Sequence, residues 1–405
     1  MLFYIHIPFC RRRCLYCAFY SQPLGTAPVP DSFVQTLSRE IALYAEHKEL
    51  WAKKDASSHP SGSSSDASRI TSIFFGGGTP SLLPPSDIAA ILDAVAASFP
   101  IADNCEISME ANPDSLASRE QVKALASAGI NRLSLGVQSM EDAELAMLGR
   151  VHNVSQVYEA CTAIHAAGIP SLNLDLMWGL PGQSKEGWLS TLKKALQLSP
   201  DHLSCYALTL ELGTPLAARV SKGELVLPNE DETEAMYLEG AELLESAGIF
   251  QYEISNYAKK GHQCRHNLGY WHQDDYLGVG PSAVSTAAGT RLTAPADYAL
   301  WEKAVQAGEL PAAREAIKGR AEVEEMIMLR LRTTEGLPYA LYRQATGRDF
   351  AGDFSDFLAV LKDADLVRMT NDSVCLTRRG LLVSNDILAR LFDMLDKLPE
   401  QEALA

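Results

Sequence analysis

The sequence predicts an α/β fold, in which a parallel β-sheet covered by helices precedes a smaller helix-rich unit. Three observations lead to this prediction. Up to about residue 206, short apolar runs alternate with longer amphipathic stretches, as in the β/α units that build parallel sheets. From about residue 296, helical patterns surround a single hairpin pattern. The chain has 405 residues, and one domain usually takes about 100–200 residues, so a large and a smaller unit both fit.

Each strand of the predicted sheet is a short apolar run, and each helix has apolar residues at helical spacing. Asp31 is the predicted N-cap of the first helix, and Gly129 and Gly168 follow two others at the position where helices commonly end. The predicted strands cover residues 1–9, 70–75, 106–110, 133–138, 171–177 and 202–206, and the helices 31–50, 88–99, 121–128, 154–167 and 185–198.

Three sequence units follow from these patterns. Residues 1–220 form the α/β unit, in which residues 52–69 are rich in Ser, Gly and Pro and indicate a flexible surface insertion. Residues 221–295 extend it, with a helix over 230–247 and a strand over 252–257. Residues 296–405 form a winged-helix-like unit, with helices over 297–308, 321–332, 354–364 and 384–395 and a hairpin of 367–370 and 373–377 turning at Asn371-Asp372.

Composition narrows the function classes. The net charge is −16 and the sequence pI about 5.0, so we expect neither general nucleic-acid binding nor attraction to anionic lipid. No apolar run is long enough for stable membrane insertion, and the N-terminus lacks the pattern of a signal peptide. Eight cysteines, of which three are clustered, indicate a reducing compartment and hence the cytoplasm. Among the scattered ones, Cys105, Cys161, Cys205 and Cys375 are predicted to be buried.

The three clustered cysteines, Cys10, Cys14 and Cys17, follow the first strand with the spacing C-x3-C-x2-C. A disulfide would pair two sulfurs and leave the third. A structural zinc site needs four ligands, and no second pair of ligands is visible. An iron–sulfur cluster usually takes four Cys thiolates. Three on one loop therefore indicate a [4Fe–4S] cluster with one iron open to a substrate or cofactor.

Polar or small residues stand where the other predicted strands end. The second strand runs into Gly76-Gly77-Gly78, and glycines allow a backbone to approach a ligand closely. In parallel α/β folds the functional groups gather at the carboxyl ends of the strands. Taken alone, each acid or amide among these residues is more typical of a helix cap or a loop hydrogen bond than of a functional site. The later strands have Glu110, Gln138, Asp175 and Ala207 at or near their ends.

The cysteine loop, entered through Tyr4-Ile5-His6-Ile7-Pro8-Phe9, and the Gly-Gly-Gly-Thr-Pro run resemble the radical S-adenosylmethionine (SAM) superfamily. The resemblance implies a partial (β/α)6 TIM-like barrel, with SAM chelated to the open iron. It is strongest to the branch of oxygen-independent coproporphyrinogen oxidase, which has a second SAM site. The residues that match the SAM pocket of this branch are Tyr4, Tyr16, Gly77, Gly78, Thr79, Glu110, Gln138, Arg150, Asp175 and Ala207.

Residues 262–271 combine histidine, cysteine and aromatic side chains. Composition alone favours a structural loop, and His262-x-Cys264-x-His266 leaves a metal clip as a further reading. The segment is, however, similar to the H-N-x-x-Y-W haem-binding motif of radical-SAM haem chaperones. That similarity implies haem binding by His266, Asn267, Tyr270 and Trp271.

Two further features separate chaperone from oxidase within this branch. The oxidases resemble C-x3-C-x2-C-x-C, whereas the chaperones have Phe at the last position, as Phe19 is here. This chain also begins almost at the first strand, without the N-terminal extension of the oxidases. Gln22 departs from the chaperone pattern, which often has His there. The resemblance thus implies a haem chaperone with a cluster, SAM and haem, serving acceptor proteins such as respiratory haem enzymes.

Two other functions stay open from the sequence. One is the oxidase itself, which removes carbon dioxide from propionate side chains through a SAM-derived radical. The other is a radical-SAM enzyme acting on a different substrate. The sequence also leaves open whether SAM is cleaved, whether a second SAM binds and whether the chain forms a homodimer.

Overall fold

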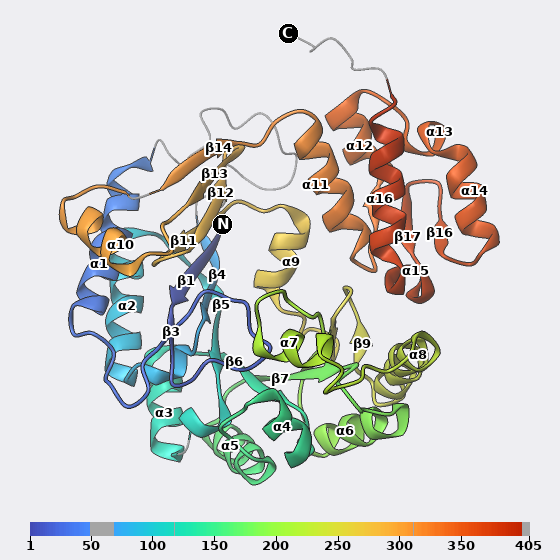
Figure 1. Ribbon diagram of the computed structural model, residues 1–405. Helices are drawn as coiled ribbons and strands as arrows, with labels where there is room; N and C mark the ends of the chain where they lie inside the picture. Colours follow the sequence, from blue (N-terminus) through green and yellow to red (C-terminus); the bar gives the residue numbers. More distant parts are fainter. Residues whose placement is uncertain (49–68, 117, 311, 399–405) are drawn as a thin grey trace.

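The computed structural model describes residues 1–48, 69–116, 118–310 and 312–398. The predicted insertion at 52–69 lies, apart from Arg69, outside these residues. Figure 1 shows a curved sheet lined by helices on its outer side, with the C-terminal helices packed together beside one end of it. No helix in the described ranges is long and apolar enough to cross a lipid bilayer.

The predicted parallel sheet is confirmed. Its six strands pair side by side in chain order, which is the arrangement of a partial (β/α)6 barrel. Their carboxyl ends therefore meet along one rim. The strands are β1 (Leu2–Ile7), β4 (Ile70–Gly77), β5 (Ile101–Ala111), β6 (Arg132–Gln138), β7 (Ser171–Trp178) and β8 (His202–Ala207).

The helices between these strands cover the outer face with apolar side chains that are fully buried, such as Ile88 and Val122. Ser118 caps α3 by accepting from the backbone of Gln121, and Gly129 ends it in the left-handed conformation. Asp31 precedes α1 but makes no side-chain cap bond, because its own backbone is already helical. These helices are α1 (Ser32–Glu46), α2 (Pro85–Ser98), α3 (Arg119–Ala128), α5 (Val154–Ala167) and α6 (Lys185–Gln197).

The sheet continues beyond the six predicted strands. On one side β11 (Tyr276–Val279) adds parallel to β1, followed by the antiparallel strands β12 (Val284–Ala287), β13 (Thr290–Thr293) and β14 (Ala313–Ala316). On the other side β10 (Asn256–Ala258) pairs with β8 and with β9 (Phe250–Gln251). A single strand over 252–257 was therefore a wrong prediction, because the chain turns back between β9 and β10. The helices α4 (Asp142–Leu148), α7 (Pro215–Ser221) and α8 (Glu230–Ser246) complete this part.

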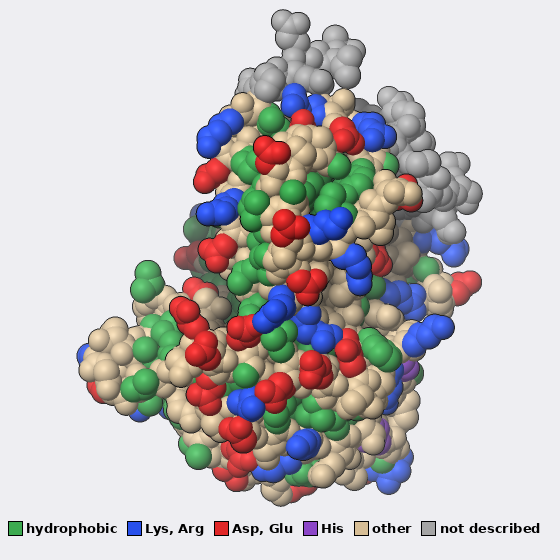
Figure 2. Space-filling view, turned by 90° about the vertical axis from the view of Figure 1, so that its right-hand side faces the viewer, with side chains coloured by type: hydrophobic (Ala, Val, Ile, Leu, Met, Phe, Trp, Pro, Cys, Tyr) green, Lys and Arg blue, Asp and Glu red, His purple; other side chains and the backbone are tan. Residues whose placement is uncertain are grey.

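Three of the four helices predicted for the C-terminal unit surround the predicted hairpin. The fourth, α10 (Tyr298–Gln306), packs instead against α1 of the barrel, where Trp301 Nε1 donates to Glu40. The strands β16 (Val367–Met369) and β17 (Ser373–Leu376) are antiparallel, and β15 (Leu337–Pro338) joins them. Figure 2 shows the side of the molecule that lies to the right in Figure 1, where basic and acidic side chains are interspersed. The helices of this unit are α11 (Arg320–Leu331), α12 (Tyr339–Thr346), α13 (Phe350–Asp353), α14 (Ser355–Asp363), α15 (Arg378–Leu382) and α16 (Ser384–Leu395).

The four cysteines predicted to be buried lie in the interior of the fold. Cys105, Cys161, Cys205 and Cys375 are all free and buried. They fall in β5, α5, β8 and β17 respectively, so they belong to the packed interior and not to the clustered cysteine loop.

Candidate functional site

The cysteine loop leaves the end of β1 at the rim formed by the strand ends. A short parallel pair, β2 (Phe9–Cys10) with β3 (Gln22–Pro23), closes the loop at its base. The backbone of Leu15 donates to the carbonyl of Leu148 at 3.0 Å and accepts from the backbone of Leu216 at 2.9 Å. The loop is thus held by α4 and α7, and all three of its cysteines are half-buried free thiols.

Polar donors already face two of these sulfurs. Thr79 Oγ1 donates to Cys10 Sγ at 3.7 Å, and Arg150 Nη1 donates to Cys14 Sγ at 3.3 Å. Among the described residues, no three His, Cys, Asp or Glu side chains converge on one point suited to a single metal ion. A cubane cluster does not need such convergence, because each cysteine binds a different iron. Three free cysteines on one pinned loop, two with donors, fit the cluster.

The glycine run after β4 packs against the strand that leads to the cysteine loop. Gly77 has a φ of +111°, and a Cβ there would come within 2.5 Å of the His6 ring. A Cβ on Gly78 would come within 2.5 Å of the carbonyl oxygen of Phe9. Only glycine fits either position, so this turn brings bare backbone beside the cysteine loop.

Two carboxyl groups line the rim next to this turn. Glu110 Oε2 accepts from the Gly77 backbone at 3.1 Å, and burial together with nearby Asp175 raises the pKa of Glu110 to about 8. Asp175 accepts from Ser134 Oγ at 3.1 Å and from Asn173 Nδ2 at 2.7 Å. A cationic ligand here would relieve the repulsion between the two groups.

Arg150 ties the loop to the strand ends. Besides Cys14, its guanidinium donates to Asn112 Oδ1 at 2.6 Å and to the Gly136 carbonyl at 2.7 Å. Its Nε is buried without a partner in the described structure. A guanidinium held in this way suits a carboxylate.

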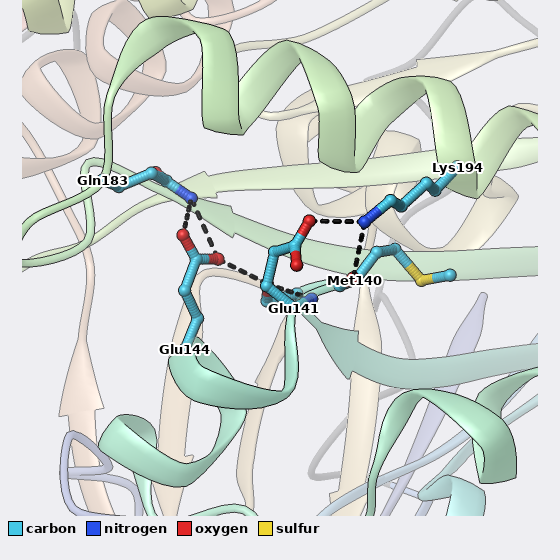
Figure 3. A network of polar contacts seen from close by, with 6 residues as sticks. Met140, Glu141, Glu144, Gln183 and Lys194 are labelled. Carbon is cyan, nitrogen blue, oxygen red and sulfur yellow. Dashed lines mark hydrogen bonds and ion pairs between the residues drawn. The ribbon is translucent and has the colours of Figure 1, made fainter.

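Gln138 ends β6 with a positive φ of 69°, an uncommon backbone conformation for a residue with a side chain. Figure 3 shows the contacts that hold the next turn. Ser139 Oγ donates to Glu144, which also accepts from Gln183 Nε2 at 3.2 Å. Lys194 Nζ donates to Glu141 Oε1 at 2.5 Å. These bonds join the start of α4 to α6, so the turn that carries Gln138 is fixed from outside.

The remaining residues predicted for the SAM pocket also lie at this rim. Tyr4 OH pairs with His6 Nδ1 at 3.0 Å, and Ala207 is exposed at the end of β8. Tyr16 lies within electrostatic range of Arg150, Cys14 and Asp175. The structure thus brings the predicted strand-end residues and the cysteine loop to one rim.

The H-N-x-x-Y-W segment is a helix, α9 (Arg265–His272), and not the predicted loop. His266 points inward and is only 1 % exposed. Its Nδ1 pairs with Ser72 Oγ at 2.8 Å and its Nε2 with Tyr270 OH at 3.0 Å. The ring also stacks on Phe74, with centroids 5.1 Å apart. Because both ring nitrogens have partners, His266 does not fit as an iron ligand in this arrangement.

The metal-clip reading is also wrong for the described residues. Cys264 Sγ donates to Glu106 Oε1 at 3.5 Å, while His262 Nδ1 pairs with Ser171 Oγ at 3.5 Å. With His266 held by Ser72, the three side chains have separate partners. Asn267, Tyr270 and Trp271 are half-buried on α9, and the Tyr270 ring meets Tyr276 edge-on, with centroids 4.6 Å apart.

A second set of polar residues, inside the barrel, was missed from the sequence. Four of them begin polar positions that recur at every second residue of β5, β6, β7 and β8, which turns them to one face, and the fifth, Tyr252, lies in the turn between β9 and β10. This alternation within strands that look buried was the available signal. The set comprises Glu106, Arg132, Asn173, His202 and Tyr252, with relative exposures of 0–7 %.

Two family models match this chain. The Radical SAM superfamily matches residues 65–195, and the HemN C-terminal domain matches residues 318–383. The solved coproporphyrinogen III oxidase (HemN) from Escherichia coli superposes with a TM-score of 0.78 at 22% identity, covering 97% of this chain and 89% of that one. At 22% identity, this match is evidence for a shared fold.

Curated relatives carry the family assignment. A Synechocystis protein described as "Heme chaperone HemW" is 35% identical, with 97% of both chains covered. The protein of the same description from Bacillus subtilis is 34% identical, with 95% of this chain and 97% of that one covered. Such similarity over nearly the whole length of both proteins leads to one conclusion: this chain is a radical-SAM protein of the HemW heme chaperone family.

Proposed function

We propose that this protein binds haem and delivers it to acceptor haem proteins. The single observation that carries the proposal is the full-length similarity to heme chaperones. Phe19 favours a chaperone over an oxidase within this branch, because it stands at the position where the oxidase pattern has a fourth cysteine. Its side chain is 75% exposed, so packing of the interior does not explain its presence.

A radical-SAM domain implies a [4Fe–4S] cluster and SAM, and we propose which residues hold them. Cys10, Cys14 and Cys17 would bind the cluster. When bound, the two groups together supply one-electron chemistry at the open iron. Arg150 would face the SAM carboxylate, and Glu110 and Asp175 its ammonium or ribose hydroxyls. The other proposed SAM contacts are Tyr4, Tyr16, Gly77, Gly78, Thr79, Gln138 and Ala207.

For haem we propose α9 as the recognition element. Tyr270 and Trp271 offer flat apolar faces with polar tips, and Asn267 adds an amide. His266 would act as a positioning group that fixes the helix, since both of its ring nitrogens have partners. A residue other than His266 would then bind the haem iron.

The wider setting is part of the same proposal. We propose respiratory haem enzymes as acceptors, a cytoplasmic location, and functional units at 1–220, 221–295 and 296–405. The oxidase is the second candidate function, because the HemN fold covers nearly this whole chain. Formation of 5′-deoxyadenosine that depends on a non-porphyrin substrate would instead support another radical reaction.

The test uses anaerobically reconstituted protein. One sample receives coproporphyrinogen, SAM and a reductant, and a parallel sample is titrated with haem. We expect saturable haem binding and no protoporphyrinogen. Formation of the decarboxylated product would favour the oxidase, and absence of both signals would reject the proposal.

A further inference from the structure

Four hydrogen bonds inside the barrel form a continuous chain from α9 to Asp175. The backbone N–H of Cys264, just before α9, donates to Tyr252 OH at 3.3 Å. Tyr252 OH is 2.8 Å from His202 Nε2. His202 Nδ1 is 2.6 Å from Asn173 Oδ1, and Asn173 Nδ2 donates to Asp175 Oδ1 at 2.7 Å.

All four bonds run in one direction. Asn173 turns its amide nitrogen toward Asp175, Ser134 and Ser204, which leaves its oxygen to accept from His202. His202 must therefore carry its proton on Nδ1, and its Nε2 accepts from Tyr252. Burial and the nearby Arg132 lower the pKa of His202 well below its usual value, so the ring is neutral. Chains of this kind polarise along their length.

We infer that Asn173, His202 and Tyr252 are positioning residues that couple the Asp175 carboxyl group at the rim to the N-terminus of α9. The inference rests on the proposed function, in which Asp175 faces SAM and α9 recognises haem. The further claim is that binding of SAM at Asp175 changes the stability of α9.

The physical basis is that no link has solvent as an alternative partner. His202 is 0 % exposed and Asn173 1 % exposed. A ligand that donates to Asp175 draws negative charge from Oδ1, so each bond back to Cys264 changes in strength. A shift of the Asp175 side chain would act along the same chain, because Asn173 would follow it and change its hydrogen bond to His202. Unpaired buried groups cost about 1–3 kcal/mol each.

The start of α9 has a second buried partner. Glu106 on β5 accepts from the backbone N–H of Arg265 at 3.0 Å and of His266 at 3.2 Å. The first backbone donors of α9 are thus satisfied by groups of the barrel interior rather than by water. The position of α9 therefore depends on how these interior groups are arranged.

Hydrogen exchange tests the inference on cluster-loaded protein, with and without SAM. The readout is the exchange of the amides of residues 264–272. We expect SAM to slow this exchange by at least about fivefold in the wild type, the lower end of usual couplings between sites. Tyr252→Phe keeps the ring and removes one link, so its response should fall below about twofold. His202→Gln breaks the chain one link further on and should behave in the same way.

Tyr237→Phe is the matched control. Tyr237 is also buried, and its hydroxyl accepts from Gln251 Nε2 at 2.8 Å, outside the chain. It should respond like the wild type, and Asp175→Asn should weaken the response to SAM. The inference is overturned if SAM leaves the exchange of the α9 amides unchanged in the wild type, or slows it equally in the wild type and in Tyr252→Phe. A haem titration of the same samples judges the proposed function separately, since exchange is measured without haem.

Discussion

His266 Nδ1 and Ser72 Oγ lie 2.8 Å apart inside the barrel, which joins α9 directly to the strand β4. The two residues are 194 positions apart in the sequence. Burial and the neighbouring Arg132 lower the pKa of His266 to about 3, so the ring stays neutral at physiological pH. A motif histidine thus serves as a structural link between the proposed haem helix and the sheet.

Removing this link should loosen α9. We expect Ser72→Ala to lower the free energy of unfolding by about 1–3 kcal/mol, because His266 Nδ1 loses its buried partner. His266→Ala should cost about 2–4 kcal/mol, since stacking on Phe74 is lost as well. Denaturant unfolding measures both. Ser86→Ala, at an exposed position, serves as the control and should stay within about 0.5 kcal/mol.

The same variants test the role of His266 in haem binding. Both should bind haem more weakly, with the greater loss for His266→Ala, because α9 no longer holds its place. A haem titration followed by absorbance measures the affinity. Unchanged affinity in His266→Ala would remove His266 from the haem site.

A methyl group at Gly78 should damage the rim. Its Cβ would meet the Phe9 carbonyl oxygen at 2.5 Å, so we expect Gly78→Ala to cost about 1–3 kcal/mol and to weaken SAM binding at least tenfold. Equilibrium dialysis of SAM and denaturant unfolding measure the two effects. Gly213→Ala is the control, because that position has no neighbours within 4 Å and a φ of +85°. It should show backbone strain of about 1 kcal/mol and normal SAM affinity.

The cluster should require the cysteines of the loop and not the buried cysteines elsewhere in the chain. We expect Cys14→Ser to abolish the cluster, measured as iron and sulfide per chain, because three thiolates are the minimum in this site. Cys161→Ala removes a buried thiol in α5 and should keep full iron and sulfide. Equal cluster content in the two variants would contradict the assignment of the loop.

Glu40 should make stability depend on pH. Its carboxylate accepts from Gly280 N at 2.7 Å and Trp301 Nε1 at 3.0 Å, yet burial raises its pKa from 4.5 to about 7. The folded state therefore holds this proton more tightly than the unfolded state. Its contribution to stability is complete below about pH 4.5 and is lost as pH rises through 7.

Glu40→Gln keeps the shape and removes this titration. Between pH 5 and pH 8 the wild type should lose about 2–3 kcal/mol more unfolding free energy than the variant. Denaturant unfolding at both pH values measures the difference. Parallel pH profiles would show that Glu40 is not the source.

The barrel was predictable because its six strands are apolar runs that alternate with regular helices. The strands β11 to β14 were not, because each has only four residues and depends on pairing with distant parts of the chain. The turn between β9 and β10 was missed for a similar reason, since Tyr252 and Ile254 favour strands but lie where the chain turns back between the two strands.

The gathering of polar groups at the rim was predictable, because parallel strands bring their carboxyl ends to one edge. The residues of the rim that lie off the strand ends, such as Tyr16 and Arg150, were implied only by the family resemblance. The role of His266 was not, since its partner Ser72 gives no sequence signal and only the fold brings the two together. The chain from Cys264 to Asp175 joins four segments whose polar residues look ordinary when taken one at a time. The placement of SAM and haem at these residues stays a prediction.

The most direct test of the central claim is haem transfer in competition with a scavenger. Haem-loaded protein is mixed with the apo form of a respiratory haem enzyme and an excess of apomyoglobin, and recovery of enzyme activity is followed. Free haem at the same concentration is the reference. We expect recovery of activity with the loaded protein despite the scavenger, and none with free haem. Equal suppression of both would mean that haem is merely released, which contradicts a delivery function.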